Sequence, residues 1–241
     1  MANRLNPVIR KELKSYFNSP IAYIAVIAFV LFSAVWLFFL QQFLARNTAS
    51  LRAYFSIMPM VFIVLIPALT MRSWAEEKKL GTDEILLTLP FKESHVVLGK
   101  FFATFILVLI MAGLTLPMPI TLNALGRFEA GEIIGQYLGL LLLAGTAIAL
   151  GQFISSVATN QISAFIFSVV ALLFITLVGQ ATAFLNLPGW LAAFFNYISL
   201  DYHFGSFEKG LLDSRDFIYF LLFTAFFLYL NMKVLALRKW K

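Results

Sequence analysis

Charged residues divide this chain into a few long apolar stretches. No acidic or basic side chain occurs within residues 15–45, 53–71, 101–126, 133–200 and 217–232. A helix needs about 20 mostly apolar residues to cross a bilayer. The shorter stretches therefore predict one membrane-spanning helix each, whereas the stretch 133–200, with 68 residues, is too long for a single span.

A polar break divides this longest stretch. The seven residues from Ser155 to Gln161 include two serines, a threonine, an asparagine and a glutamine, a composition typical of a turn. We therefore predict spans over residues 133–154 and 162–184, which brings the total to six.

The remainder of the long stretch, residues 185–200, is too short for another span. It begins with an Asn-Leu-Pro-Gly turn signal and carries Trp190 and Tyr197, aromatic types that are enriched at membrane interfaces. We predict an interfacial or re-entrant segment there, within an extracytoplasmic region that covers residues 185–216.

The composition agrees with this pattern. Hydrophobic types make up 61% of the 241 residues and charged types 12%, against roughly half and a quarter in soluble domains. A soluble core of this size cannot hide so much apolar surface. The composition excludes a cytosolic enzyme and a disordered tail, and the absence of cysteine excludes a disulfide scaffold. The predicted fold is an all-α integral membrane protein, with residues 1–241 as one transmembrane domain.

The distribution of basic residues predicts the orientation. With six spans, one side of the membrane receives 13 Lys and Arg residues and the other side 5. Because basic residues accumulate on the cytoplasmic side, both termini are predicted to be cytoplasmic. The net charge of +6 then favours attraction to anionic lipid headgroups, and no nucleic-acid partner is expected.

Residues 6–17 predict an amphipathic helix ahead of the first span. Asn6 suits the N-cap and Pro7 the first helical position, where its missing N–H costs nothing. At about 100° per residue, the side chains separate onto two faces. The apolar face holds Ile9, Leu13, Tyr16 and Phe17, and the basic face holds Arg10, Lys11 and Lys14. Such a helix lies in the headgroup plane; the alternative is a basic flank that only sets topology.

The loop 72–100 contains ten of the 30 acidic and basic residues of the chain. The second span is expected to continue as helix to Lys79, and Gly81 to end it in a left-handed conformation. Thr82 can then cap a short helix over residues 82–89, with Asp83 and Glu84 favoured by the helix dipole and Pro90 preventing continuation.

This short helix presents apolar side chains on one side, namely Ile85, Leu86 and Leu89. An apolar face that is held outside the membrane needs a partner groove. The alternative is a solvated hairpin whose apolar residues fold back onto the bilayer. Spacing alone does not decide between them.

At these residues the sequence resembles the permease subunits of ABC-2 type ATP-binding-cassette transporters. The residues that carry the resemblance are Arg72, Ala75, Glu76, Glu77, Gly81, Thr82, Glu84, Leu86, Leu87 and Pro90, followed by Leu98, Gly99 and Lys100. Residues 19–23, 66–72, 160–165 and 203–220 resemble a narrower branch, the gliding-motility-associated permease subunits, which also occurs in bacteria that do not glide.

The resemblance implies a complex of two six-span permease chains, identical or related, each docked to an ATPase subunit. It also implies an interfacial helix before the first span, re-entrant helices between spans 5 and 6, and a coupling helix at residues 82–89 that the ATPase moves. The expected coupling residues are Glu76, Glu77, Gly81, Thr82, Asp83, Glu84, Ile85, Leu86, Leu89 and Pro90.

Several chemistries are not expected in this chain. There is no G-x-x-x-x-G-K-[ST] phosphate loop, so ATP and magnesium would be bound by the partner ATPase. His203 lies near Asp201 and Ser206, but without an oxyanion-hole pattern catalysis is not expected. With only two distant histidines, no metal site is expected either.

Small residues recur at a spacing of four at Gly131, Gly135 and Gly139, which allows helices to approach closely. Packing within the chain is favoured over a dimer contact.

Added to these patterns, the resemblance implies a permease subunit of an ATP-driven ABC-2 type exporter in a bacterial cytoplasmic membrane. A second reading is a non-transporting anchor in an ATP-driven envelope or gliding-motility machine. A third, a secondary transporter or channel, is weakened because no ionisable residue lies well inside any predicted span.

Overall fold

In the computed structural model of this protein, the described residues are 2–43, 50–81, 93–123, 128–184 and 188–239. Every regular element among them is helical. The elements are α1 (Ala2–Phe17), α2 (Pro20–Val35), the π-helical turn η1 (Trp36–Leu40), α4 (Arg52–Phe55), α5 (Met58–Thr70), α6 (Arg72–Leu80), α8 (Glu93–Thr115), α9 (Pro117–Asn123), α10 (Ala130–Val157), α11 (Gln161–Phe184), α12 (Gly189–Ile198), α13 (Leu200–Glu208) and α14 (Ser214–Lys239).

Among the described residues, six helical segments are long and apolar enough to cross a membrane, in agreement with the predicted number. They are Pro20–Leu40, Arg52–Leu80, Glu93–Asn123, Ala130–Val157, Gln161–Gln180 and Ser214–Leu237. The second and third extend well beyond the uncharged stretches of the sequence. A charged side chain does not interrupt the backbone hydrogen bonds of a helix, so these helices continue past the apolar layer.

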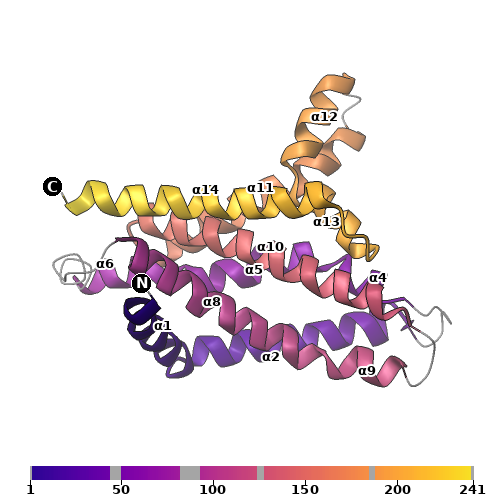
Figure 1. Cartoon of the computed structure of the whole chain (residues 1–241), viewed down its shortest axis with the longest axis horizontal. Coiled ribbons are helices and arrows are strands. Elements are labelled where there is room, and N and C mark those ends of the chain that lie inside the picture. The colour runs from indigo at the N-terminus through magenta and orange to yellow at the C-terminus, as the bar shows by residue number, and fades with distance from the viewer. Residues whose placement is uncertain (1, 44–49, 82–92, 124–127, 185–187, 240–241) are drawn as a thin grey trace.

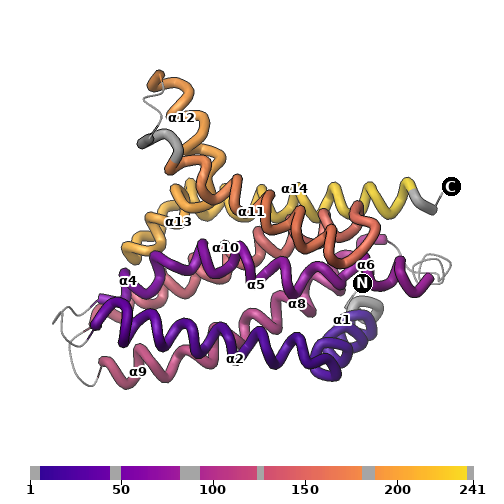
Figure 2. Tube along the Cα trace, turned by 180° about the vertical axis from the view of Figure 1, so that it is seen from behind, coloured from indigo at the N-terminus to yellow at the C-terminus, as the bar shows by residue number. Residues whose placement is uncertain are grey.

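The long helices run side by side as a bundle, and α1 is set at an angle to them (Figures 1 and 2). Helices α1 and α6 and the last turns of α14 lie at one end, on the left in Figure 1, which we call the α6 end. Helices α4 and α9 lie at the opposite end, the α9 end. Helix α12 stands out from the side of the bundle in both views.

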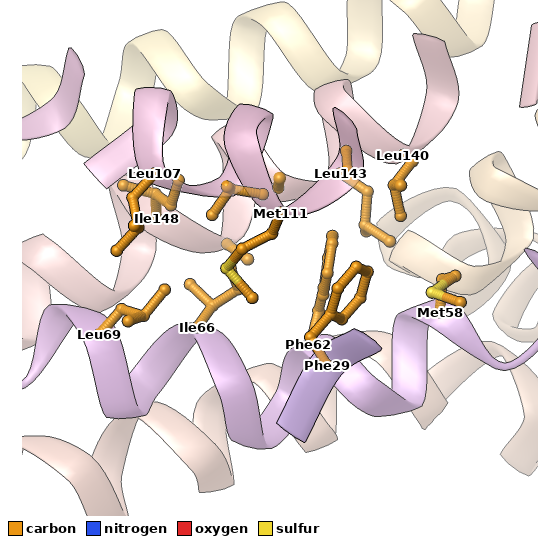
Figure 3. Close-up of a cluster of buried hydrophobic side chains, with 14 of the residues drawn as sticks. Phe29, Met58, Phe62, Ile66, Leu69, Leu107, Met111, Leu140, Leu143 and Ile148 are labelled. Atoms are coloured by element: carbon orange, nitrogen blue, oxygen red, sulfur yellow. The ribbon is translucent and has the colours of Figure 1, made fainter. Parts of the chain in front are cut away.

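The core lies between α5, α8 and α10, the three spans that bury most of their residues. Figure 3 shows side chains from these helices meeting in the middle of the bundle, among them Ile66, Leu107 and Ile148, none of which is accessible to solvent. The spans that contain α2, α11 and α14 bury only about a quarter of their residues. Their exposed apolar faces suit contact with lipid.

Close helix approach at small residues occurs within this chain. A methyl group added at Gly139 of α10 would lie 2.2 Å from Cβ of Phe207 on α13, and one at Gly135 would lie 2.9 Å from the carbonyl oxygen of Gly210. Gly131 has open space around it. The prediction that this spacing serves internal packing is therefore confirmed at Gly135 and Gly139.

Two short helices, α12 and α13, follow the fifth span, separated by Ser199. The Ser199 hydroxyl accepts a hydrogen bond from the backbone N–H of Tyr202 and donates one to the carbonyl of Thr176, 2.9 Å away. Helix α12 contains no buried residue, and Trp190 and Tyr197 are 73% and 70% exposed. Its ten residues are too few for a span, in agreement with the predicted non-spanning segment, of which residues 185–187 lie outside the described part.

Helix α1 begins at Ala2 and not at Asn6, so the predicted N-cap was wrong. Pro7 lies inside the helix, one turn from its start. Proline cannot donate a backbone hydrogen bond. The bond that is missing here would only have fastened the first turn, so the rest of the helix is unaffected.

Candidate functional site

Helix α6 precedes residues 82–92 in the sequence and helix α8 follows them. Helix α5 passes through Met71 directly into α6, and α6 ends at Gly81, whose φ of +66° is left-handed as predicted. The Gly81 N–H donates to the carbonyl of Lys78, which closes the last turn. Seven predicted coupling residues lie outside the described part of the chain: Thr82, Asp83, Glu84, Ile85, Leu86, Leu89 and Pro90.

A buried lysine joins three helices at this end of the bundle. The Nζ atom of Lys100 on α8 lies 3.0 Å from Oε1 of Glu12 on α1 and 3.0 Å from Oε1 of Glu77 on α6. It also lies 4.9 Å from the centre of the Trp74 ring. The Lys100 side chain is 2% exposed, and the two carboxylates are 14% and 13% exposed. We call Glu12, Glu77 and Lys100 the triad.

The triad alone would carry one uncompensated negative charge. Lys11 balances it, because its Nζ lies 3.4 Å from Oε1 of Glu77 and 3.9 Å from Oε1 of Glu12. Lys11 is 62% exposed, so its own contribution is screened by water. Charges removed from water are stable only when they are paired with good geometry, and Lys100 meets this condition with two carboxylates and a ring face.

Tyr16 adds a neutral polar contact beside the triad. Its hydroxyl donates to the carbonyl of Leu69 at 3.1 Å and lies 2.9 Å from the hydroxyl of Thr104. Burial raises the pKa of Tyr16 above its ordinary value, so the hydroxyl keeps its proton and remains a donor. The tyrosine therefore ties α1 to both α5 and α8.

Helix α1 thus packs on protein along one face. Val8 sits so close to Gly99 that a methyl group added there would lie 2.6 Å from Cγ1 of Val8. The packed face consists of Val8, Glu12 and Tyr16, which follow one another at intervals of four. Of the predicted apolar face, Ile9 and Leu13 are half-buried and Phe17 is exposed; the predicted basic residues Arg10, Lys11 and Lys14 are all exposed.

Arg72 occupies the adjoining corner between α1 and α6. Its Nε atom lies 3.2 Å from Oε2 of Glu76, its guanidinium donates to the hydroxyls of Ser19 and Ser15, and it covers the Tyr16 ring. A polar cavity of about 270 Å³ lies between α1 and α6, with Arg72, Glu76 and the triad in its wall. Glu76, at 38% exposed, is more accessible than Glu77.

Helix α6 is also fastened to the end of α10. The hydroxyl of Ser155 accepts hydrogen bonds from the N–H groups of Trp74 and Ala75 and donates to the carbonyl of Met71. Lys78 donates to the carbonyls of Ser156 and Ala158, where a cation complements the C-terminal dipole of α10. Helix α6 is therefore held by α1, α8 and α10 together.

His203 belongs to a different cluster near the α9 end. Its Nδ1 atom lies 2.6 Å from Oδ1 of Asp216, its Nε2 atom lies 3.0 Å from the carbonyl oxygen of Tyr197, and its ring stacks on Tyr219. A carbonyl only accepts, so Nε2 carries a proton. Asp201, which the sequence places beside His203, instead accepts a hydrogen bond from Gln180. Both ring nitrogens of His203 are engaged, and the cluster links α12, α13 and α14.

Sequence reasoning missed the triad because its members are distant in sequence. Glu12 lies in a helix whose sequence indicates only a basic and an apolar face, and Lys100 was considered only as a residue of the family resemblance at the end of the loop 72–100. The available signal was the interval of four that places Val8, Glu12 and Tyr16 on one face.

Comparison with known proteins adds no relative. No protein-family model matches the chain, and no curated protein matches it.

Proposed function

We propose that this chain is the membrane-spanning permease subunit of an ATP-driven ABC-2 type exporter in a bacterial cytoplasmic membrane. It would work as a pair of permease chains, identical or related, with a separate ATPase subunit docked on residues 82–92. The six apolar spans and the residue pattern of the loop 72–100 support this assignment.

The observation that carries the proposal is the fastening of α6 and α8 around this loop. Lys100 joins the two helices to each other and to α1 through the triad. A force applied to residues 82–92 therefore enters two helices that are already locked together.

The helices behind the loop are suited to transmit such a force. The segment Arg52–Leu80 consists of α4, α5 and α6 in succession, 29 residues that span about 44 Å at 1.5 Å per residue. Because its α6 part projects beyond the apolar span and is clamped by α1, α8 and α10, a push at its tip displaces the span instead of bending the tip. ATP and magnesium would be held by the partner subunit, and the permease would contribute the moving spans.

The accessible acidic groups refine the expected contact. Glu77 is occupied by Lys100 and Lys11, whereas Glu76 lies at the edge of the cavity beside Arg72. We therefore expect a partner to contact Glu76 directly and to depend on Glu77 only through the position of α6.

The first test is purification of the full chain from its native membranes in mild detergent, followed by mass spectrometry of co-purifying proteins. The expected result is a stoichiometric subunit that carries a phosphate loop. A homo-oligomer without any ATPase, reproduced under cross-linking, would contradict the proposal. Transport of a labelled cargo by the complex distinguishes an exporter from a mechanical anchor.

A charge reversal tests the docking segment itself. Glu84→Lys should weaken retention of the ATPase about tenfold, because a carboxylate expected to attract the ATPase would be replaced by a charge that repels it. The matched control is Glu129→Lys, the same change at an exposed glutamate beside α10 at the α9 end. Equal retention of the ATPase by both variants would refute docking at residues 82–92.

A further inference from the structure

An apolar groove runs between α2 and α5 on the outer face of the bundle. Its volume is about 490 Å³, within the range of ligand sites in proteins. All of its lining side chains are apolar, and they include Ile21, Ala28, Phe32, Met60, Val64 and Ala68. The lining itself is partly exposed, as at Ile24 with 64%, so the groove opens to the outside of the bundle.

The groove ends at a cluster of hydrogen-bond donors. Ala68 lines the groove, and Arg72 follows it by four residues, on the same helical face one turn beyond. On the opposite wall, Ile21 lines the groove and Ser19 precedes it by two residues. The guanidinium of Arg72 donates to the hydroxyl of Ser19, so the two walls meet at this polar mouth.

The position of this mouth matches the membrane boundary. The span Pro20–Leu40 has 21 residues and is about 31 Å long. The hydrocarbon core of a bilayer is about 30 Å thick. Ser19, directly before this span, therefore lies where the phosphate groups of a phospholipid begin. Arg72 is at the same depth, because it contacts Ser19.

The charges at the mouth favour an anion. Arg72 is partly neutralised by Glu76 at 3.2 Å, and the neighbouring α1 presents the exposed basic residue Lys14 beside Ser15, whereas Lys11 pairs with Glu77. Glu12 and Glu77 face Lys100 on the inner side of α1. The N-terminus of α2 adds the positive end of its dipole at Ser19. Basic groups at this depth attract anionic headgroups.

We propose that this groove binds one membrane phospholipid, with an acyl chain between α2 and α5 and the phosphate at Arg72 and Ser19. Lipid tails are as apolar as the groove wall, so apolar transfer alone does not retain one lipid in preference to another. Retention of the lipid would come from the fit of its acyl chain to the groove and from the charged groups at the mouth. The bound lipid would thereby pack between the first two spans as a permanent part of the bundle. The inference depends on the membrane location and does not depend on an ATPase partner.

The proposed acyl-chain site is tested by photolabelling of the full-length protein in nanodiscs. The discs contain phosphatidylethanolamine and phosphatidylglycerol, with a trace of phosphatidylglycerol that carries a diazirine on one acyl chain. Adducts are expected to concentrate on groove residues such as Phe32 and Val64. Ala28→Phe, which fills the groove, should lower this labelling at least fivefold. Ile27→Phe, at an exposed position of α2 outside the groove, should leave it unchanged.

The headgroup site is tested by native mass spectrometry of protein released from the same discs. Arg72→Gln should lower the retained phosphatidylglycerol about fivefold, and Arg72→Lys should lower it less, because the charge remains. The map of adducts on the unaltered chain does not depend on how well the variants fold.

Two results would overturn the proposal. The first is uniform labelling of all lipid-facing residues with no difference between Ala28→Phe and Ile27→Phe. The second is cross-linking of two protein copies through the groove, which would assign the groove to a second chain. Neither result would affect the docking of an ATPase on residues 82–92, so the two proposals fail independently.

Discussion

At the scale of single residues, Lys100 has the most demanding environment in the described part of the chain. Its ammonium is removed from water and is stabilised by two carboxylates and the face of Trp74. A buried charge that loses its partner costs far more than the pair contributes. The lysine is therefore the position at which a single substitution tests the whole junction.

Lys100→Met should destabilise the protein by about 3–5 kcal/mol, because two partly buried carboxylates lose their common cation. Thermal unfolding in detergent measures the effect. Lys79→Met is the matched control at an exposed position of α6 and should change little. Combining Lys100→Met with Glu12→Gln and Glu77→Gln should recover part of the loss. Equal unfolding temperatures for Lys100→Met and Lys79→Met would show that the triad contributes no stability.

At the scale of helices, close contact between α10 and α13 depends on a residue without a side chain. Gly139 faces Phe207, and no rotamer of the phenylalanine moves its Cβ atom away from an added methyl group. The contact positions α13, and through His203 and Asp216 it also supports the start of α14. Helix-helix distance here is set by backbone approach and not by side-chain interdigitation.

Gly139→Ala should destabilise the protein by about 1–3 kcal/mol through overpacking. Gly131→Ala on the same helix is the control, since nothing lies within 4 Å of the added methyl group. The control should be neutral or slightly stabilising, because alanine favours helix over glycine by about 1 kcal/mol. Unfolding in detergent distinguishes them, and equal behaviour would contradict close approach at Gly139.

At the scale of the whole molecule, the bundle has a buried centre of three spans and an outer set whose apolar side chains are largely exposed. Helices α5, α8 and α10 form the centre, and α2, α11 and α14 lie outside it. The α6 end carries the triad and helix α6, which is held by α1, α8 and α10. The α9 end carries a second polar junction, in which Arg52 pairs with Glu208 at 2.9 Å. Spans held together at both ends by polar contacts are expected to move as units.

The excess of basic residues predicts that the α6 end faces the cytoplasm. The chain contains no cysteine, so single cysteines can be introduced without background. In intact spheroplasts, a membrane-impermeant maleimide should label Glu129→Cys, and it should label Lys79→Cys only after the membrane is opened. Labelling of Lys79→Cys in intact spheroplasts would reverse the orientation. Labelling of both positions would indicate fewer or more spans than six.

Much of the element plan was predictable because it depends on local composition. The six spans follow from apolar length, and the end of α6 follows from Gly81, where a left-handed residue is needed. Of the candidate coupling site, the sequence identified Glu76 and Glu77 as polar positions but did not separate their roles. Only the structure shows that Glu77 turns toward Lys100 while Glu76 remains at the edge of the cavity.

The sequence by itself determined the number of helices long and apolar enough to span a membrane, the end of α6 and the exposed basic face of α1. Each of these follows from length, period or backbone conformation within one segment. Tertiary structure alone decided which helices form the core and that Glu12 meets Lys100 across 88 positions. The physical reason is that a membrane helix is apolar on its lipid-facing and its protein-facing sides alike, so its pattern does not mark the buried face.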